Sequence, residues 1–195
     1  CVGSRRADRN WCSAVCCMVA TKQTLITQEH APGTGCTVFF IDFRAYGKGF
    51  DAYYERARAS GVRYVRAMPS SIKQDPHTEN LEIQYALPDG SVTTETFDLV
   101  VLSVGLQAPT GMARLAEELE VRLTPDGFCR TTNLSPLNTT RDGVYVCGPF
   151  AEPKDIPETV MSASAAAARA MTLLADARHT LVKPKEYPPE IDVSG

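Results

Sequence analysis

The order of apolar and polar positions in the first third of the chain predicts alternating helices and strands. A helix over residues 12–26, which contain no Gly or Pro, precedes a continuous apolar run over residues 36–43. That run is rich in β-forming residues and is typical of a strand buried on both sides of a parallel sheet. A helix over residues 50–60, ended by Gly61, and a short strand over residues 62–67 complete the rhythm of a nucleotide-binding α/β fold.

After residue 80, apolar side chains recur at every second position, which is the period of a β-strand. Residues 81–87 and 91–97 alternate apolar and polar side chains on either side of a Pro-Asp-Gly turn at 88–90. We therefore expect an antiparallel β-meander inserted in the α/β unit, with room for a further strand within residues 70–87.

The second half of the chain returns to buried segments. Residues 98–104 predict another buried parallel strand, which ends at Gly105. A helix over residues 112–120 and a short hairpin over residues 121–134, with its turn at 125–127, are expected to follow.

The last predicted elements are a strand and a long helix. Residues 143–147 favour a short buried strand that stops at Gly148, and residues 158–177 favour an alanine-rich helix. Small residues at the start of such a helix would let a flat or anionic ligand approach the backbone, where free amides and the helix dipole favour negative charge. Tight packing of the alanines against a sheet is the alternative interpretation.

Composition narrows the functional classes. The 195 residues could form one domain or two small ones, and a formal net charge of −3 without a Lys/Arg cluster argues against nucleic-acid binding. No apolar run approaches the roughly 20 residues that a membrane-spanning helix needs, and no signal peptide is recognisable. With its odd count of 7 cysteines, the chain is predicted to be cytoplasmic.

Four of those cysteines fall within the first seventeen residues, at Cys1, Cys12, Cys16 and Cys17. On the predicted helix Cys12 and Cys16 would share a face, with Cys17 one step round and Cys1 folding back from the preceding loop. Thiolates gathered in this way suit zinc or an iron–sulfur cluster. Core packing, a disulfide and zinc are alternatives. The paired C-x2-C knuckles usual for zinc are absent, nothing marks the chain as secreted, and a vicinal disulfide at Cys16–Cys17 would be strained. An iron–sulfur cluster is therefore favoured.

Two stretches resemble one family. Residues 1–5 (CVGSR) with 11–22 (WCSAVCCMVATK) look like the cluster-binding signature of the flavoproteins that form the A subunits of heterodisulfide reductase. Residues 143–149 (GVYVCGP) with 153–167 (PKDIPETVMSASAAA) resemble the carboxyl-terminal flavin segment of the same family. The strand that ends at Gly105 is similar to the second glycine motif of flavoproteins with two dinucleotide-binding domains.

The resemblance implies a fold, two cofactors and a set of site residues. The fold would be part of a two-dinucleotide-binding-domain, Rossmann-like α/β flavoprotein, with a parallel sheet and the inserted meander. The cofactors would be FAD and a [4Fe-4S] cluster with Cys1, Cys12, Cys16 and Cys17 as ligands. By the same resemblance Lys22 would act as a catalytic cation at the flavin N5/O4 edge. The residues expected along the flavin are Gly105, Gly148, Lys154, Asp155, Ile156, Thr159 and Ser162.

The sequence departs from the flavoprotein pattern at two points. Pro149 follows Gly148 where related flavoproteins carry Asp, so that Asp155 or backbone amides would have to substitute. The G-x-G-x-x-G fingerprint for the FAD pyrophosphate is also missing, because Gly33-Thr34-Gly35 and Gly47-Lys48-Gly49 lack the third glycine. We expect that motif upstream in a larger polypeptide, and weak FAD binding by this chain alone.

These interpretations define the expected organisation. Residues 1–107 would form a cluster-bearing, nucleotide-binding-like domain, residues 108–180 the carboxyl-terminal part of an FAD domain, and residues 181–195 a linker. The resemblance implies an oxidoreductase that passes electrons between flavin and clusters, together with other subunits of a heterodisulfide reductase-like complex and with donor or acceptor proteins. It leaves a homodimer open. The alternative is a non-catalytic docking or dimerisation module with structural zinc or no metal.

Overall fold

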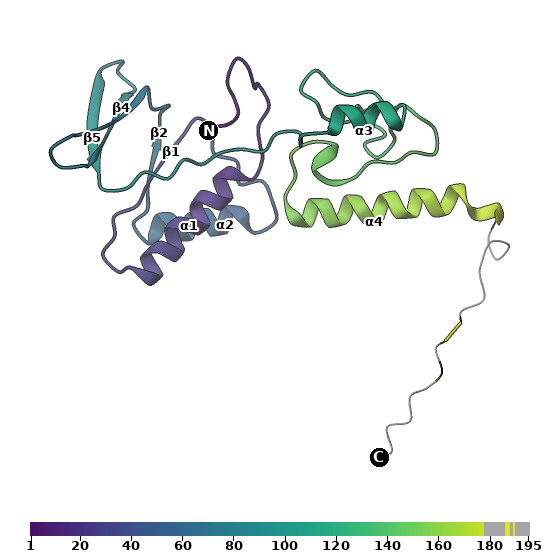
Figure 1. Ribbon diagram of the computed structural model, residues 1–195. Coiled ribbons are helices and arrows are strands. Elements are labelled where there is room, and N and C mark those ends of the chain that lie inside the picture. Colours follow the sequence, from purple (N-terminus) through teal and green to yellow (C-terminus); the bar gives the residue numbers. More distant parts are fainter. Residues whose placement is uncertain (178–185, 188, 190–195) are drawn as a thin grey trace.

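The computed structural model describes residues 1–177, 186, 187 and 189, and most of them fold into two lobes joined by an extended stretch (Figure 1). The first lobe contains α1 (Cys16–His30), β1 (Thr37–Phe40), α2 (Phe50–Ala59), β2 (Arg63–Arg66), β3 (Ser71–Gln74), β4 (Leu81–Ala86) and β5 (Val92–Phe97). The second contains α3 (Met112–Glu118), α4 (Ile156–Leu173) and the 3₁₀ turns η1 (Gly148–Phe150) and η2 (Ala175–Ala177). The linker expected at 181–195 lies outside the described residues apart from 186, 187 and 189.

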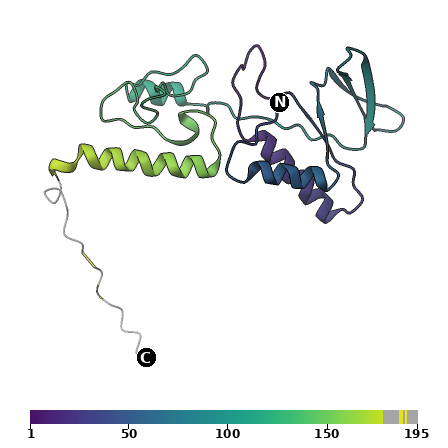
Figure 2. The same ribbon diagram turned by 180° about the vertical axis from the view of Figure 1, so that it is seen from behind.

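The parallel sheet predicted from the first third of the chain is confirmed. β1 and β2 pair in parallel with Thr37 opposite Arg63, although β1 is shorter than the predicted run over residues 36–43. α1 and α2 lie together beside this sheet in both views (Figures 1 and 2). Leu25 of α1, Ala57 of α2 and Val62, which directly precedes β2, form one buried apolar cluster.

The antiparallel meander is also confirmed. β3, β4 and β5 form a three-stranded antiparallel sheet in chain order. Along β4 the residues Ile83 and Tyr85 are buried while their neighbours are exposed, as the alternating pattern predicts. The meander packs on the parallel sheet through Phe39, whose ring meets that of Tyr85 edge-on at 5.0 Å.

Two predicted strands of the second half differ from the structure. The predicted strand over residues 98–104 is wrong: this stretch belongs to neither sheet, and Leu99 is 77% exposed. The strand over residues 143–147 is reduced to a single bridge between Asn138 and Tyr145. Residues 98–104 pair with no strand of either described sheet, and residues 143–147 pair only with the short segment around Asn138, so an apolar run alone does not make a strand. Cys147, at the end of the second run, is exposed.

The core of the second lobe instead forms around a turn. Ala116 of α3, Val121, Cys129 and Val146 are buried together. The predicted hairpin over residues 121–134 appears as one antiparallel bridge between Leu123 and Cys129. α4 lies along the base of this lobe (Figure 1). It begins at Ile156, two residues before the predicted start, and ends at Leu173, four residues before the predicted end of the helix over 158–177. No helix among the described residues has the length and apolar character needed to cross a membrane.

Candidate functional site

The first fifteen residues form a loop that is pinned along the segment joining the two lobes. Val2 donates its backbone N–H to the carbonyl of Ser103 (3.4 Å), and the indole of Trp11 donates to the carbonyl of Leu106 (2.9 Å). The hydroxyl of Ser13, fully buried, accepts the backbone N–H of Leu106 at 2.8 Å. The cysteine-bearing loop is therefore fixed by residues about ninety positions later in the chain.

This anchoring explains why the predicted helix starts late. Ala14 adopts a left-handed backbone conformation (φ 63°), which interrupts a right-handed helix, and α1 begins only at Cys16. The inference that Cys12 and Cys16 share a helix face is therefore wrong. Cys12 lies in the loop instead, where its sulfur accepts the backbone N–H of Ala14 at 3.4 Å.

Cys16 and Cys17 form a buried pair of thiols at the start of α1. A hydrogen bond with Cys17 lowers the pKa of Cys16 to about 6, and the opposing effect of burial is smaller. The same hydrogen bond and burial raise the pKa of Cys17, whose thiol also lies 3.8 Å from the carbonyl oxygen of Asp42. The hydrogen bond thus favours the thiolate of Cys16, which is the form of cysteine that binds metals.

The four predicted ligands are brought together only in part. Ser103 connects two of them: its carbonyl accepts from Val2, next to Cys1, and its hydroxyl donates to the carbonyl of Cys16 (3.3 Å). Within the described residues, no three or more His, Cys, Asp or Glu side chains converge as a metal-binding group.

The chemistry of the site nevertheless fits a thiolate-bound centre. Cys16 and Cys17 supply two soft sulfur donors at the start of α1, and the pKa of the Cys16 thiol is lowered by its hydrogen bond with Cys17. Arg5 adds an unused donor, because its Nη1 is buried without a hydrogen-bond partner among the described residues. Such a group is the kind of donor that an anionic sulfur centre would satisfy.

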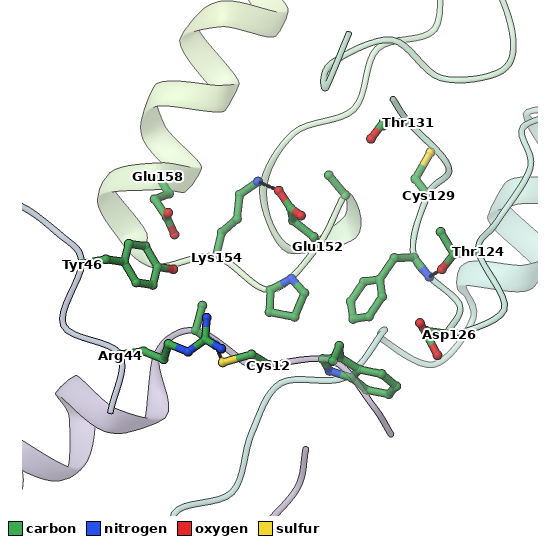
Figure 3. Close-up of a pocket in the computed structure, with 15 residues that line it drawn as sticks. Cys12, Arg44, Tyr46, Thr124, Asp126, Cys129, Thr131, Glu152, Lys154 and Glu158 are labelled. Atoms are coloured by element: carbon green, nitrogen blue, oxygen red, sulfur yellow. Dashed lines mark hydrogen bonds and ion pairs between the residues drawn. The ribbon is translucent and has the colours of Figure 1, made fainter. Parts of the chain in front are cut away.

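Cys12 also faces a cavity of about 530 Å³ between the loop and the second lobe (Figure 3). Arg44 and Tyr46 contribute from the segment after β1, Lys154 from just before α4, and Glu158 from the first turn of α4. Only 17% of the Lys154 side chain is exposed, and its amino group pairs with Glu152 on the cavity wall. The remaining lining residues are Trp11, Ala14, Thr124, Asp126, Phe128, Cys129, Thr131, Ala151 and Pro153.

The amino-terminal end of α4 is closed by its own side chains. Asp155 accepts the backbone N–H of Glu158 (2.8 Å), and the carboxylate of Glu158 accepts the backbone N–H of Asp155 (3.0 Å), which makes a capping box. Pro157 has no N–H, and Thr159 donates to the carbonyl of Asp155. Few backbone N–H groups at the start of α4 are therefore left to bind an anion, contrary to the expectation from the sequence.

The other residues expected along the flavin lie around this helix start. Gly148 has φ 64°, a conformation that glycine adopts without strain, and its N–H donates to the hydroxyl of Ser162 at 3.0 Å. Ser162 donates in turn to the carbonyl of Thr159. Ile156 is largely exposed and lies outside the cavity lining.

Comparison with known proteins identifies the family. Residues 39–170 match the family described as pyridine nucleotide-disulphide oxidoreductase, and this span includes the end of β1, all of β2, the meander and most of α4. The chain belongs to the pyridine nucleotide-disulphide oxidoreductase family.

Several curated relatives are described as A subunits of heterodisulfide reductase or as similar to them. The second iron-sulfur A subunit of the CoB–CoM heterodisulfide reductase of Methanopyrus kandleri is 42% identical over 90% of this chain and 28% of its own length. The corresponding iron-sulfur A subunit of Methanocaldococcus jannaschii is 40% identical over 86% and 26%. A protein of Archaeoglobus profundus, described as similar to heterodisulfide reductase A subunits, is 36% identical over 93% and 26%. The resemblance to these A subunits is confirmed, and the chain spans about a quarter of the length of the curated relatives it matches.

Two of the predicted site residues lie away from the cavity. Lys22 is exposed on α1, and Gly105 packs against Ser13. Their predicted roles stay predictions.

Sequence reasoning missed Arg44 and Tyr46 as cavity residues, since they lie in an irregular loop without a motif. Trp11 could have been found from its position directly before Cys12.

Proposed function

We propose that this chain is the part of a flavin-dependent oxidoreductase at which electrons pass between an iron–sulfur cluster and FAD. The single observation that carries the proposal is the shared cavity: Cys12 lines it from the cysteine loop, and Lys154 lines it from the flavin segment. Family membership and the names of the relatives, which describe iron-sulfur A subunits of heterodisulfide reductases, support it.

Each part of the site has a defined task in this proposal. Cys1, Cys12, Cys16 and Cys17 hold the [4Fe-4S] cluster. This requires the loop around Cys12 to turn its sulfur from the Ala14 amide toward the Cys16–Cys17 pair. Bound cluster and flavin supply one-electron and two-electron transfer. Lys154 provides the cation on the cavity wall, and Trp11 with Phe128, in edge contact at 5.6 Å, helps to exclude water.

The proposal extends to partners. Because the relatives are named as A subunits of heterodisulfide reductases, we expect the chain to work with other subunits and with proteins that donate or accept electrons. Co-purification of other proteins with this chain tests for such subunit contacts.

Anaerobic reconstitution with iron and sulfide tests the cluster. The wild-type chain should take up about four irons and four sulfides, and should give an electron paramagnetic resonance signal after reduction with dithionite. Serine variants at Cys1, Cys12, Cys16 and Cys17 should each lose most of this iron. Cys147→Ser is the matched control, since Cys147 is an exposed cysteine of the second lobe and should keep full uptake.

Two results would contradict the proposal. If Cys16→Ser and Cys147→Ser bound the same amount of iron, the cysteine loop would not be the cluster site. Binding of one zinc ion without sulfide would favour the alternative of a docking module with a structural metal.

The flavin part is tested separately through Trp11, the only tryptophan of the chain. Added FAD should quench Trp11 fluorescence if the flavin enters the cavity that Trp11 lines. Lys154→Ala should weaken this quenching, whereas Lys22→Ala should weaken it only if the exposed Lys22 reaches the flavin. Quenching that is unaffected by Lys154→Ala would place the flavin elsewhere.

A further inference from the structure

Arg5 occupies a constrained position in the cysteine loop. Its backbone is left-handed (φ 60°), a conformation that costs free energy for a residue with a side chain. The conformation is held by the surrounding loop, where the N–H of Arg5 donates to the carbonyl of Trp11 at 3.0 Å. The loop thus fixes the direction in which this guanidinium leaves the backbone.

The guanidinium is held on one side only. Nη2 donates to the Oδ2 of Asp42 at 2.7 Å, whereas Nη1 is buried and has no acceptor among the described residues. A buried, charged N–H group without a partner is unfavourable, and native proteins seldom leave one unless something else satisfies it. Arg5 therefore has a donor ready for an acceptor that the polypeptide does not supply.

Asp42 contacts both the Arg5 guanidinium and the cysteine pair. Its carbonyl oxygen lies 3.8 Å from the thiol sulfur of Cys17, while its carboxylate binds Arg5 on one oxygen and Arg66 on the other (3.1 Å). The two faces of one residue thus contact the guanidinium and the thiol. Through this residue Arg5 also ties the loop that carries Cys1 and Cys12 to the end of β1.

We infer that Arg5 is a hydrogen-bond donor to the sulfur centre, with Nη1 directed to a sulfide or thiolate of the proposed cluster and Nη2 held by Asp42. This inference rests on the proposed function. A positively charged donor stabilises the reduced cluster, which carries one more negative charge, and so raises the reduction potential.

Redox titration of the reconstituted chain tests the inference. Wild type, Arg5→Gln, Arg5→Lys and Arg6→Gln are poised anaerobically with dithionite and mediators, and the reduced fraction is measured by electron paramagnetic resonance. Arg6→Gln is the matched control: it removes the same charge from the adjacent position, where Arg6 is 54% exposed and pairs with Asp8.

Arg5→Gln should lower the ratio of reduced to oxidised cluster about tenfold at a fixed potential, which is a shift of about 59 mV for a one-electron couple. Arg5→Lys keeps the charge and the reach to Asp42 but has no second nitrogen, so it should shift the ratio in the same direction by a smaller factor. Arg6→Gln should leave the potential at the wild-type value.

Each outcome decides one of the two proposals. A wild-type chain that takes up no cluster overturns the proposed function. A loaded Arg5→Gln protein with the potential of Arg6→Gln overturns only the role of Arg5. If Arg5→Gln does not fold, as judged by circular dichroism, the Arg5→Lys comparison decides, and an unshifted potential there contradicts the Nη1 hydrogen bond.

Discussion

Ser13 and Gly105 are in such close contact that a methyl group on Gly105 would lie 2.0 Å from the Ser13 hydroxyl oxygen. Ser13 is fully buried, and its hydroxyl holds the amide of the next residue, Leu106. The glycine predicted as a flavin motif therefore has a structural requirement of its own: it allows the cysteine loop to lie against the segment between the lobes.

Gly105→Ala should destabilise the chain through this contact. Neither the buried serine nor the backbone can yield without breaking the hydrogen bond to Leu106, so we expect the free energy of unfolding to fall by about 1–3 kcal/mol. Urea denaturation followed by circular dichroism measures it. Gly35→Ala is the control, because nothing lies within 4 Å of a methyl group there. Equal stability of the two variants would show that the loop does not pack on Gly105.

Asp155 should act first as a helix cap. Asp155→Ala removes the acceptor for the Glu158 amide and should lower the free energy of unfolding by about 1 kcal/mol. Asp155→Asn should keep nearly all of it, since asparagine caps helices about as well as aspartate. A loss of the same size in both variants, in urea titrations at pH 7, would point to the charge of Asp155 rather than to its capping geometry.

Glu95 should make stability depend on pH. The Arg63 guanidinium and the Tyr85 hydroxyl hold the pKa of Glu95 below its usual value. Because the folded pKa is lowered, the interaction stabilises the fold above the unfolded pKa of about 4.3 and is lost as the pH falls through the folded pKa.

The measurement compares Glu95→Gln with wild type. The variant should lose roughly 1 kcal/mol at pH 7, and the difference should shrink between about pH 5 and 3. Glu82→Gln, on the exposed side of β4, serves as the control. A difference that is constant with pH would exclude ionisation of Glu95 as its cause.

The sequence predicted the elements whose signals are local. α2 lies between Gly49 and Gly61, both with positive φ, and β4 alternates buried and exposed side chains, so neighbouring residues were sufficient. Residues 98–104 were misjudged because burial of a strand depends on what lies beside it. Apolar composition alone does not supply that neighbour.

In the candidate site too, the residues marked by local motifs were predicted, whereas those placed by long-range contacts were not. The motifs located Cys16, Cys17 and the start of α4, since each is marked by residues next to it in the chain. The displacement of Cys12 from the helix could not be predicted, because it depends on the hydrogen bond between Ser13 and Leu106, 93 residues apart. Arg44 and Tyr46 entered the cavity without any periodic signal.

Ala14 offers the sharpest test of that displacement. An alanine in the left-handed region costs about 1–2 kcal/mol, and glycine adopts it freely but loses more entropy on folding, by about 0.5–1 kcal/mol. Ala14→Gly should therefore raise the free energy of unfolding by roughly 0.5 kcal/mol. Ala20→Gly, the same substitution inside α1, should lower it by about 1 kcal/mol. If urea denaturation showed both variants to be destabilised by the same amount, Ala14 would be helical. Cys12 and Cys16 would then share a helix face, as first predicted.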